Sequence, residues 1–503
     1  MTGRHPVVGA EAAGVGPGGL APKTLTGPSL WFFCVGAASP MTVFAGASVA
    51  AFATTGVVGL PLSFVVLGVP LWLLTVGYVA MARHVPSAAP FYSVLLHGLG
   101  RVCGVAGAGV AVLGYAAIQA ALYGLLGTAM SGMFGWPWVA WAMIAVAVVG
   151  VFGVVHPKAS ARVLAVLLVA EIGVIALFDV FALLNPAEGL WSWAPLDPGA
   201  LLVNGVGGVF AMAVACFVGY ESAPVYGEEA RSAGTVRRAS FATLGFLVLF
   251  YCVSVTAVAN AAGAGRIVEL SRNPAGWDPF ALFPVVMGPV WGGIAAAFGH
   301  LFLVTSVLAA ILALHNNGAR YVFALARERV LPHRWAATNT GRAAGAPWAG
   351  SLVQSTIVGT VLAATAVAGI APMAMFTWAA AVGGVAIMSV LVATAAAAIP
   401  FFHHGRGGND SIWVRRVAPW LGLGTGAVVL TTMIVNGDSL LGLPPSAEAL
   451  KWVVPGLVGG CALAAALRAA YLYLARRDVY DALGAGPPSI IAQPVTRLNS
   501  LEV

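Results

Sequence analysis

The stretch FAMAVACFVGYESAPVYGEE, residues 210–229, decides how this chain is organised. It is an apolar membrane helix interrupted in its middle by Gly219, Glu221 and Pro224. A carboxyl at that depth costs roughly 3 kcal/mol or more against lipid, so Glu221 is expected to face the protein interior or a water-filled cavity. Gly219 has no Cβ and Pro224 has no N–H, so the helix is expected to unwind and leave backbone groups free for a ligand. The alternative is a kinked helix whose glutamate bonds to neighbouring backbone.

The composition is that of a membrane protein. Hydrophobic residues make up 60% of the chain and charged residues 8%, and the mean hydropathy is +0.93. Ordinary soluble domains carry roughly a quarter charged residues. A spanning helix needs roughly 20 apolar residues, so the apolar runs predict an all-α polytopic membrane protein with twelve transmembrane helices. Two helices fit each of 24–82, 102–157 and 343–409, and one helix fits each of 162–185, 201–227, 239–265, 291–318, 417–436 and 452–474.

The basic residues predict the orientation. With an even number of spans both termini lie on one side, and of the 24 Lys and Arg only Arg266, Arg272 and Lys451 fall on the other side. Cytoplasmic loops of membrane proteins are enriched in Lys and Arg. We therefore expect a multi-pass protein of the cytoplasmic (inner) membrane with both termini cytoplasmic. The net charge of +7 then reflects topology, and no nucleic-acid partner is inferred.

A second interruption lies in the first predicted helix, at SPMT, residues 39–42. Pro40 cannot donate its amide, and Gly36 with its small neighbours lets the chain loosen. The alternative is an ordinary proline kink. The two breaks lie in the first and sixth helices, which correspond if helices one to five and six to ten are two inverted copies. Interrupted segments at matching positions of inverted halves point to a transporter site.

Three motifs carry a resemblance to a known family. They are HVPSAAPFY at 84–92, FVGYES at 217–222 with its trailing GEEA, and ARERVLP at 326–332. On these motifs the chain resembles the amino acid-polyamine-organocation superfamily of permeases, over about residues 28–475. The resemblance implies a five-plus-five inverted repeat with broken helices 1 and 6 and alternating access. One departure is that most relatives carry a Gly-Ser-Gly type break where this chain has SPMT.

These observations predict four regions. They are a disordered cytoplasmic tail at 1–27, a transport core at 28–400 with repeats at about 28–185 and 201–400, helices 11 and 12 at 401–475, and a cytoplasmic tail at 476–503.

Two broken helices suit a zwitterionic ligand. The half-helix that begins near Thr42 presents N–H groups and the positive end of its dipole to a carboxylate. The half-helix that ends near Val218 presents carbonyls to an ammonium group. The predicted substrate-binding residues are Ala38, Ser39, Met41, Thr42, Gln119, Ala215, Cys216, Val218 and Gly219.

The resemblance implies roles for three of these residues. Ala215 lies where many relatives place a bulky aromatic gate above the substrate, Cys216 lies beside it, and Gln119 lies where relatives place a polar substrate contact. Gln119 has an equal second interpretation as a hydrogen bond between helices, worth about 1 kcal/mol or less. The absence of a second acidic group beside Glu221 favours a neutral substrate.

Glu171 is the second intramembrane carboxyl. By resemblance it matches a position where some proton-coupled relatives have a lysine, and a carboxyl there could load and release a proton. The alternative is a structural hydrogen bond between helices. Sodium coupling is less favoured, because the part of the eighth helix expected to supply hydroxyl ligands, residues 310–314, reads AILAL. Thr305 and Ser306 are expected about a turn further out along that helix. Asp179, near the outer end of the same helix, is expected to be solvated.

Other chemistry is not indicated. His300 and His315 could relay protons or simply pack, and the five cysteines are scattered without metal-ligand spacing. The chain shows no nucleotide-binding loop and no catalytic triad, so we predict no enzyme, cofactor or metal. The predicted function is secondary transport of amino acids, neutral ones above all, or related amines, with symport of protons or exchange (antiport). The expected partners are this small-molecule substrate, protons and the lipid bilayer. Two alternatives stay open, a permease-like amino acid sensor and a same-fold transporter of another solute such as a nucleobase.

Overall fold

The computed structural model describes residues 25–154, 158–273, 277–339, 346–406, 408, 410–442 and 445–485, without the side chains of 158–164 and 445–448. Within these ranges the chain is helical and forms no strand, apart from an isolated parallel bridge between Leu25 and Ala230. The chain is thus an all-α protein, as predicted. Most of the two expected tails, residues 1–24 and 486–503, lies outside the described residues.

Eleven helices in the described part of the chain are long and apolar enough to cross a membrane. A further apolar helix, α7 at Trp138–Val154, has 17 residues, and with it the number would reach the predicted twelve, which stays a prediction. The helices are α1 (Gly27–Ala38), α2 (Pro40–Thr42), α3 (Ser48–Thr55), α4 (Leu60–His84), α5 (Pro90–Leu99), α6 (Arg101–Phe134), α7, α8 (Lys158–Leu184), α9 (Val206–Phe217), α10 (Ala233–Ala262), α11 (Ile267–Ser271), α12 (Leu282–Met287), α13 (Pro289–Arg327), α14 (Trp348–Val367), α15 (Pro372–His403), α16 (Ala418–Val435), α17 (Asp438–Leu441), α18 (Val453–Ala475) and α19 (Arg477–Ala482).

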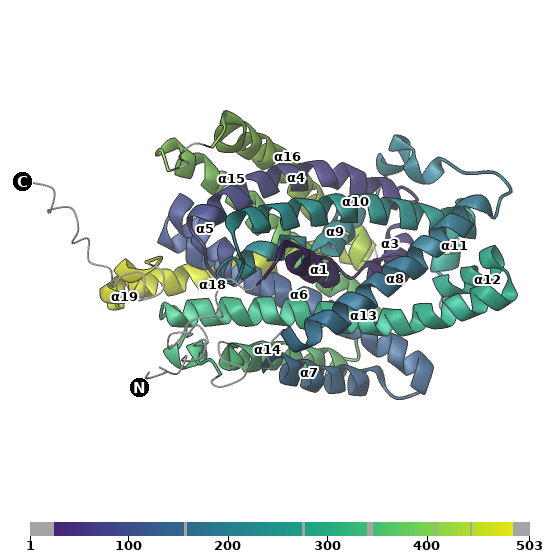
Figure 1. The fold of residues 1–503 in the computed structure, drawn as a ribbon, viewed down its shortest axis with the longest axis horizontal. Coiled ribbons are helices and arrows are strands. Elements are labelled where there is room, and N and C mark those ends of the chain that lie inside the picture. Colours follow the sequence, from purple (N-terminus) through teal and green to yellow (C-terminus); the bar gives the residue numbers. More distant parts are fainter. Residues whose placement is uncertain are drawn as a thin grey trace, which may run out of the picture.

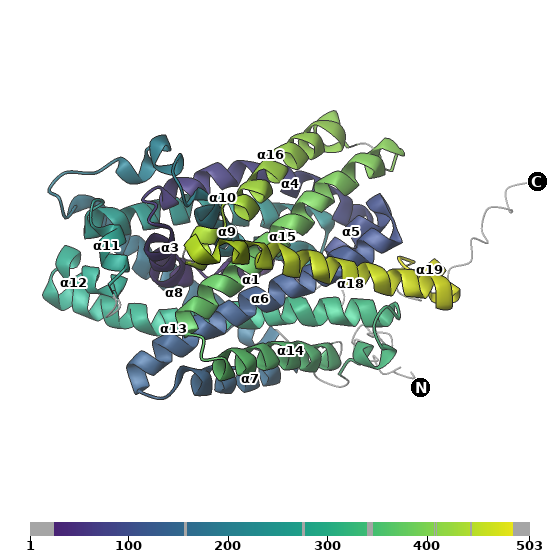
Figure 2. The ribbon, with the colours of Figure 1, turned by 180° about the vertical axis from the view of Figure 1, so that it is seen from behind.

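The long helices run side by side along the longest axis of the molecule, with α1 and α9 in the middle (Figure 1). Helices α6, α8, α10, α13 and α15 surround this centre, and α7 pairs with α14 at one edge. Helix α18 runs across one face on top of α6, and α16 packs on α4 and α15 (Figure 2). The last two long helices therefore lie on the outside of the bundle, and the broken helices lie at its core.

The first predicted break is present. Helix α1 ends at Ala38, because Ser39 adopts a left-handed conformation with φ 50° and Pro40 supplies no N–H. A short α-helical turn, α2, and a π-helical turn at Val43–Ala47 then lead into α3. A left-handed residue other than glycine is costly and is held only where the surrounding structure demands it. The start of the second half-helix is therefore a specified feature of the fold.

The second predicted break is also present. Helix α9 ends at Phe217, Val218 leaves the helical conformation with φ −55° and ψ 127°, and Gly219 has φ 115°. A 3-10 segment, Tyr220–Tyr226, follows. A Cβ on Gly219 would lie 2.6 Å from the Cβ of Ala37, so both the backbone conformation and the close approach require glycine. The two breaks thus touch each other at the centre of the bundle.

Candidate functional site

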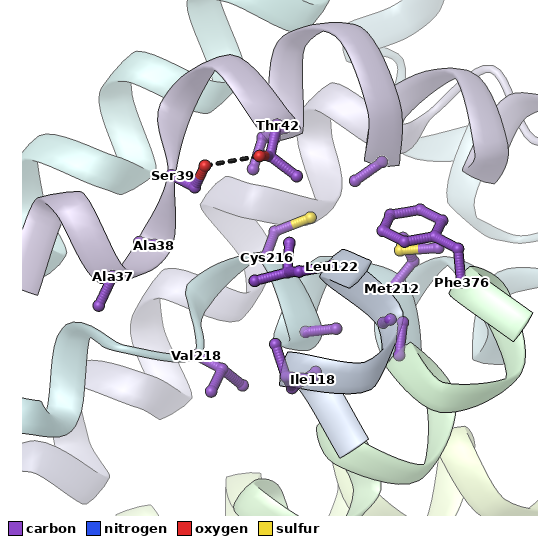
Figure 3. Close-up of a pocket in the computed structure, with 15 residues that line it drawn as sticks. Ala37, Ala38, Ser39, Thr42, Ile118, Leu122, Met212, Cys216, Val218 and Phe376 are labelled. Carbon is purple, nitrogen blue, oxygen red and sulfur yellow. Dashed lines mark hydrogen bonds between the residues drawn. The ribbon is translucent and has the colours of Figure 1, made fainter. Parts of the chain in front are cut away.

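A small cavity lies where the two breaks meet (Figure 3). It offers about 30 Å³ to the centre of a water molecule, which is room for about two waters. Six of the predicted substrate-binding residues line it, namely Ala38, Ser39, Thr42, Ala215, Cys216 and Val218. A ligand as large as an amino acid can enter only when the lining moves apart, so the structure shows the site in a closed arrangement.

The rest of the cavity wall is apolar. Ile118 and Leu122 come from α6, Met212 from α9 and Phe376 from α15. No charged side chain is among the described residues that line the cavity. Met212 lies one turn before Cys216, so helical spacing could have indicated it. Phe376 had no such signal, because it reaches the cavity from a helix far away in the sequence.

Three predicted binding residues lie outside the cavity lining. Met41 and Gly219 are buried in the two breaks and do not line the cavity. The side chain of Gln119 accepts a hydrogen bond of 3.0 Å from Gln354 on α14 and lies 3.4 Å from His315 on α13. This arrangement supports the interpretation of Gln119 as a link between helices. Its contact with a substrate stays a prediction.

A chain of hydroxyl groups joins Glu171 to the first break. The Ser306 hydroxyl donates to Glu171 at 3.0 Å, and the Ser39 hydroxyl lies 2.8 Å from Ser306 and 2.5 Å from the hydroxyl of Thr42. With the carboxylate as the end acceptor, each hydroxyl donates to the next one toward Glu171. Ser306, one turn before Ala310 on α13, therefore lies beside the first break.

Glu221 bonds to the backbone of the second break. Its Oε2 accepts a hydrogen bond of 2.8 Å from the N–H of Gly219, and its side chain is fully buried. The other carboxyl oxygen has no hydrogen-bond partner in the described part of the chain. Both interpretations of this stretch therefore hold in part, since the helix unwinds and the glutamate also bonds to neighbouring backbone.

A buried ion pair follows the 3-10 segment that leads away from the cavity-lining Val218. Arg320 on α13 bonds to Glu229 at 2.8 and 3.2 Å, and the ring of Tyr226 lies 4.4 Å from the guanidinium. Phe33 of α1 stacks on Tyr226, and the N–H of Leu25 donates to the carbonyl of Glu229. The pair therefore joins α13, the end of the 3-10 segment and the start of α1. We call these five residues the closed end.

A neighbouring cluster ties the C-terminal segment to α13. The Tyr92 hydroxyl donates to Glu328 at 2.5 Å, and the N–H of Gly484 donates to the same carboxylate at 2.8 Å. Burial and the charge of Glu328 raise the pKa of Tyr92, so its hydroxyl stays protonated and remains a donor at neutral pH.

Two other titratable residues, Asp179 and His300, differ in their exposure to solvent. Asp179 is buried and accepts a hydrogen bond of 2.7 Å from Ser254, so the expectation that it is solvated is wrong. The reason is that α10 covers this face of α8. His300 lies at the surface 2.9 Å from Asp278. Among the described residues no cluster of three or more His, Cys, Asp or Glu could hold a metal ion.

A bundle of apolar helices in which two broken helices meet at a buried cavity is the architecture of a membrane transporter. A family model of amino acid permeases matches residues 25–451, and the chain belongs to this family. The protein is thus a multi-pass membrane transporter of the permease type rather than an enzyme, and it acts on a small molecule.

Solved structures agree on the fold. One mutant form of the Eremococcus coleocola manganese transporter is 16% identical, with a TM-score of 0.52, and the match covers 90% of this chain and 95% of that chain. A second mutant form is 15% identical, with a TM-score of 0.53 and coverage of 92% and 100%. The same transporter in complex with an aromatic bis-isothiourea substituted compound is 14% identical, with a TM-score of 0.50 and coverage of 90% and 94%. At these identities the likeness shows the fold alone. No curated protein sequence matches.

Proposed function

We propose that this protein is a secondary transporter that moves neutral amino acids or related amines across the cytoplasmic membrane by alternating access. The observation that carries the proposal is that the breaks of two helices meet at one cavity. The half-helix that starts at Pro40 directs the positive end of its dipole toward a carboxylate. The end of α9 supplies carbonyls for an ammonium group.

The cavity wall supports a neutral substrate with an apolar or small side chain. A cationic or anionic side chain buried beside Ile118, Met212 and Phe376 would have no opposite charge to pair with. Ala215 leaves space where a larger residue would fill the cavity. Size and polarity of the side chain, rather than its charge, then set the selectivity.

The chain of hydroxyls supports coupling to protons. When Glu171 is ionised, Thr42, Ser39 and Ser306 each donate toward it. When Glu171 takes up a proton it becomes a donor, and every hydrogen bond in the chain can reverse. The hydroxyl of Thr42 then turns its proton toward the cavity. Protonation of a residue on α8 therefore changes the polarity of the substrate site, which is the differential interaction that coupling needs.

The distribution of basic residues supports an orientation with cytoplasmic termini and with the closed end toward the cytoplasm. The decisive experiment is uptake of a panel of labelled amino acids into proteoliposomes, with and without an imposed pH gradient. Manganese belongs in the panel, because the similar solved structures are of a manganese transporter. Accumulation of neutral amino acids driven by the gradient is expected. Binding without uptake would favour the sensor, and uptake of manganese or a nucleobase alone would refute the proposed substrate.

A further inference from the structure

Tyr251, on α10, contacts both broken helices with one atom. Its hydroxyl lies 2.9 Å from the carbonyl oxygen of Ala38 and 3.3 Å from that of Cys216. Ala38 is the last residue of α1, Cys216 lies in the last turn of α9, and both line the cavity. The Tyr251 ring is fully buried and packs against Phe64 and Phe217. The packed ring thus holds the hydroxyl between two carbonyls that belong to different helices.

A phenol has a single proton, so the two carbonyls share it. Each carbonyl oxygen has two lone pairs and keeps accepting capacity after this contact, and the phenol oxygen can itself accept a hydrogen bond. Two partly satisfied carbonyls of cavity-lining residues suit a ligand group with several N–H donors and a positive charge. Without the phenol proton, two carbonyl dipoles would face each other with nothing between them, and a bound ligand would have to bring them together.

We infer that Tyr251 is a positioning residue that holds the carbonyls of Ala38 and Cys216 at the spacing at which both accept from one ammonium group. The inference rests on the proposed function only for the identity of the ligand. The hydroxyl itself links α10 to the ends of α1 and α9.

The first test needs no ligand. Tyr251→Phe keeps the ring and removes only the hydroxyl, and Tyr78→Phe is the matched control. The Tyr78 hydroxyl is also buried and lies 3.4 Å from a carbonyl in the second break, that of Glu221, but Glu221, unlike Ala38 and Cys216, does not line the cavity. The alkylation rate of Cys216 by N-ethylmaleimide is followed by mass spectrometry in detergent, and thermal unfolding checks that both variants are folded. We expect the rate to rise roughly fivefold or more in Tyr251→Phe and less than about twofold in Tyr78→Phe. An unchanged rate in Tyr251→Phe, or an equal rise in both variants, overturns the inference.

The second test asks whether the effect is specific to the ammonium group. Alanine and lactate, which carries a hydroxyl in place of the ammonium, are compared as inhibitors of labelled alanine uptake. Tyr251→Phe should weaken inhibition by alanine roughly fivefold or more and change that by lactate less than about twofold. Equal weakening of both compounds would show a general structural role and refute the inference. If lactate does not inhibit uptake by the parent protein, inhibition by alanine is compared between Tyr251→Phe and Tyr78→Phe. An equal loss of alanine inhibition in both variants refutes the inference. If the parent protein carries no amino acid, the proposed function fails, while the Cys216 test still decides whether Tyr251 links the two breaks.

Discussion

The buried ion pair of the closed end gives the sharpest quantitative prediction. The Arg320 and Glu229 side chains are only 5% and 6% exposed, and they share two hydrogen bonds. Arg320→Met removes the cation and leaves a buried carboxylate without its partner. Breaking a buried pair in this way costs about 3–5 kcal/mol, and the lost contact with the Tyr226 ring adds about 0.5–2 kcal/mol.

This penalty destabilises only the conformation in which the closed end is shut. A penalty of 3 kcal/mol changes a two-state ratio by about 150-fold, so a closed state favoured a hundred times would lose its majority. Cys34, fully buried in α1, is a natural reporter of the opening. We expect its reaction with a membrane-impermeant thiol reagent, applied from the side of the closed end in proteoliposomes, to speed up by at least tenfold.

Two variants serve as controls for this prediction. Arg327→Met breaks the ion pair between Arg327 and Glu228, whose side chains are more exposed, at 11% and 20% respectively. This variant should change the labelling rate of Cys34 much less. The double variant Arg320→Met/Glu229→Met removes both charges and should largely restore the closed state, since a hydrophobic pair of similar volume often replaces a buried ion pair without loss. Equal labelling in the parent and in Arg320→Met would refute the view that this pair holds the site closed.

Three further predictions concern topology, selectivity and coupling. Cysteines introduced at positions 233 and 340 should react only from the cytoplasm, and one at position 270 only from outside. Position 340 lies outside the described residues. Labelling of position 270 from the cytoplasm would overturn the orientation. Ala215→Trp fills the cavity and should weaken binding of large side chains more than of glycine or alanine, whereas equal losses in competition assays would place Ala215 in a packing contact. Glu171→Gln mimics the protonated carboxyl and should still exchange substrate but lose accumulation driven by a pH gradient, while Glu221→Gln should impair transport more severely because Glu221 holds the backbone of the second break. Undiminished accumulation by Glu171→Gln would make Glu171 a packing residue.

Much of the architecture follows from local properties of the sequence. Apolar runs of helical length specify a membrane bundle, because an unsatisfied backbone group in hydrocarbon costs several kcal/mol and only helices or closed barrels avoid it. The breaks follow from Pro40, Gly219 and Pro224, whose effects on φ and on the N–H inventory need no tertiary partner. Six of the nine predicted binding residues line the cavity, since they lie next to these breaks in the chain.

The contacts between helices were decided by the tertiary structure alone. Helical periodicity tells which residues share a face, but not which neighbour that face meets or how far each helix is rotated about its axis. Tyr251 bridges two carbonyls and Ser306 joins Glu171 to Ser39 only because α10 and α13 pack against the breaks in one particular register. The same packing covers Asp179 and directs Gln119 to other helices instead of the cavity. The position of a break is thus a property of a few consecutive residues, whereas the groups that surround it depend on side-chain packing over the whole bundle.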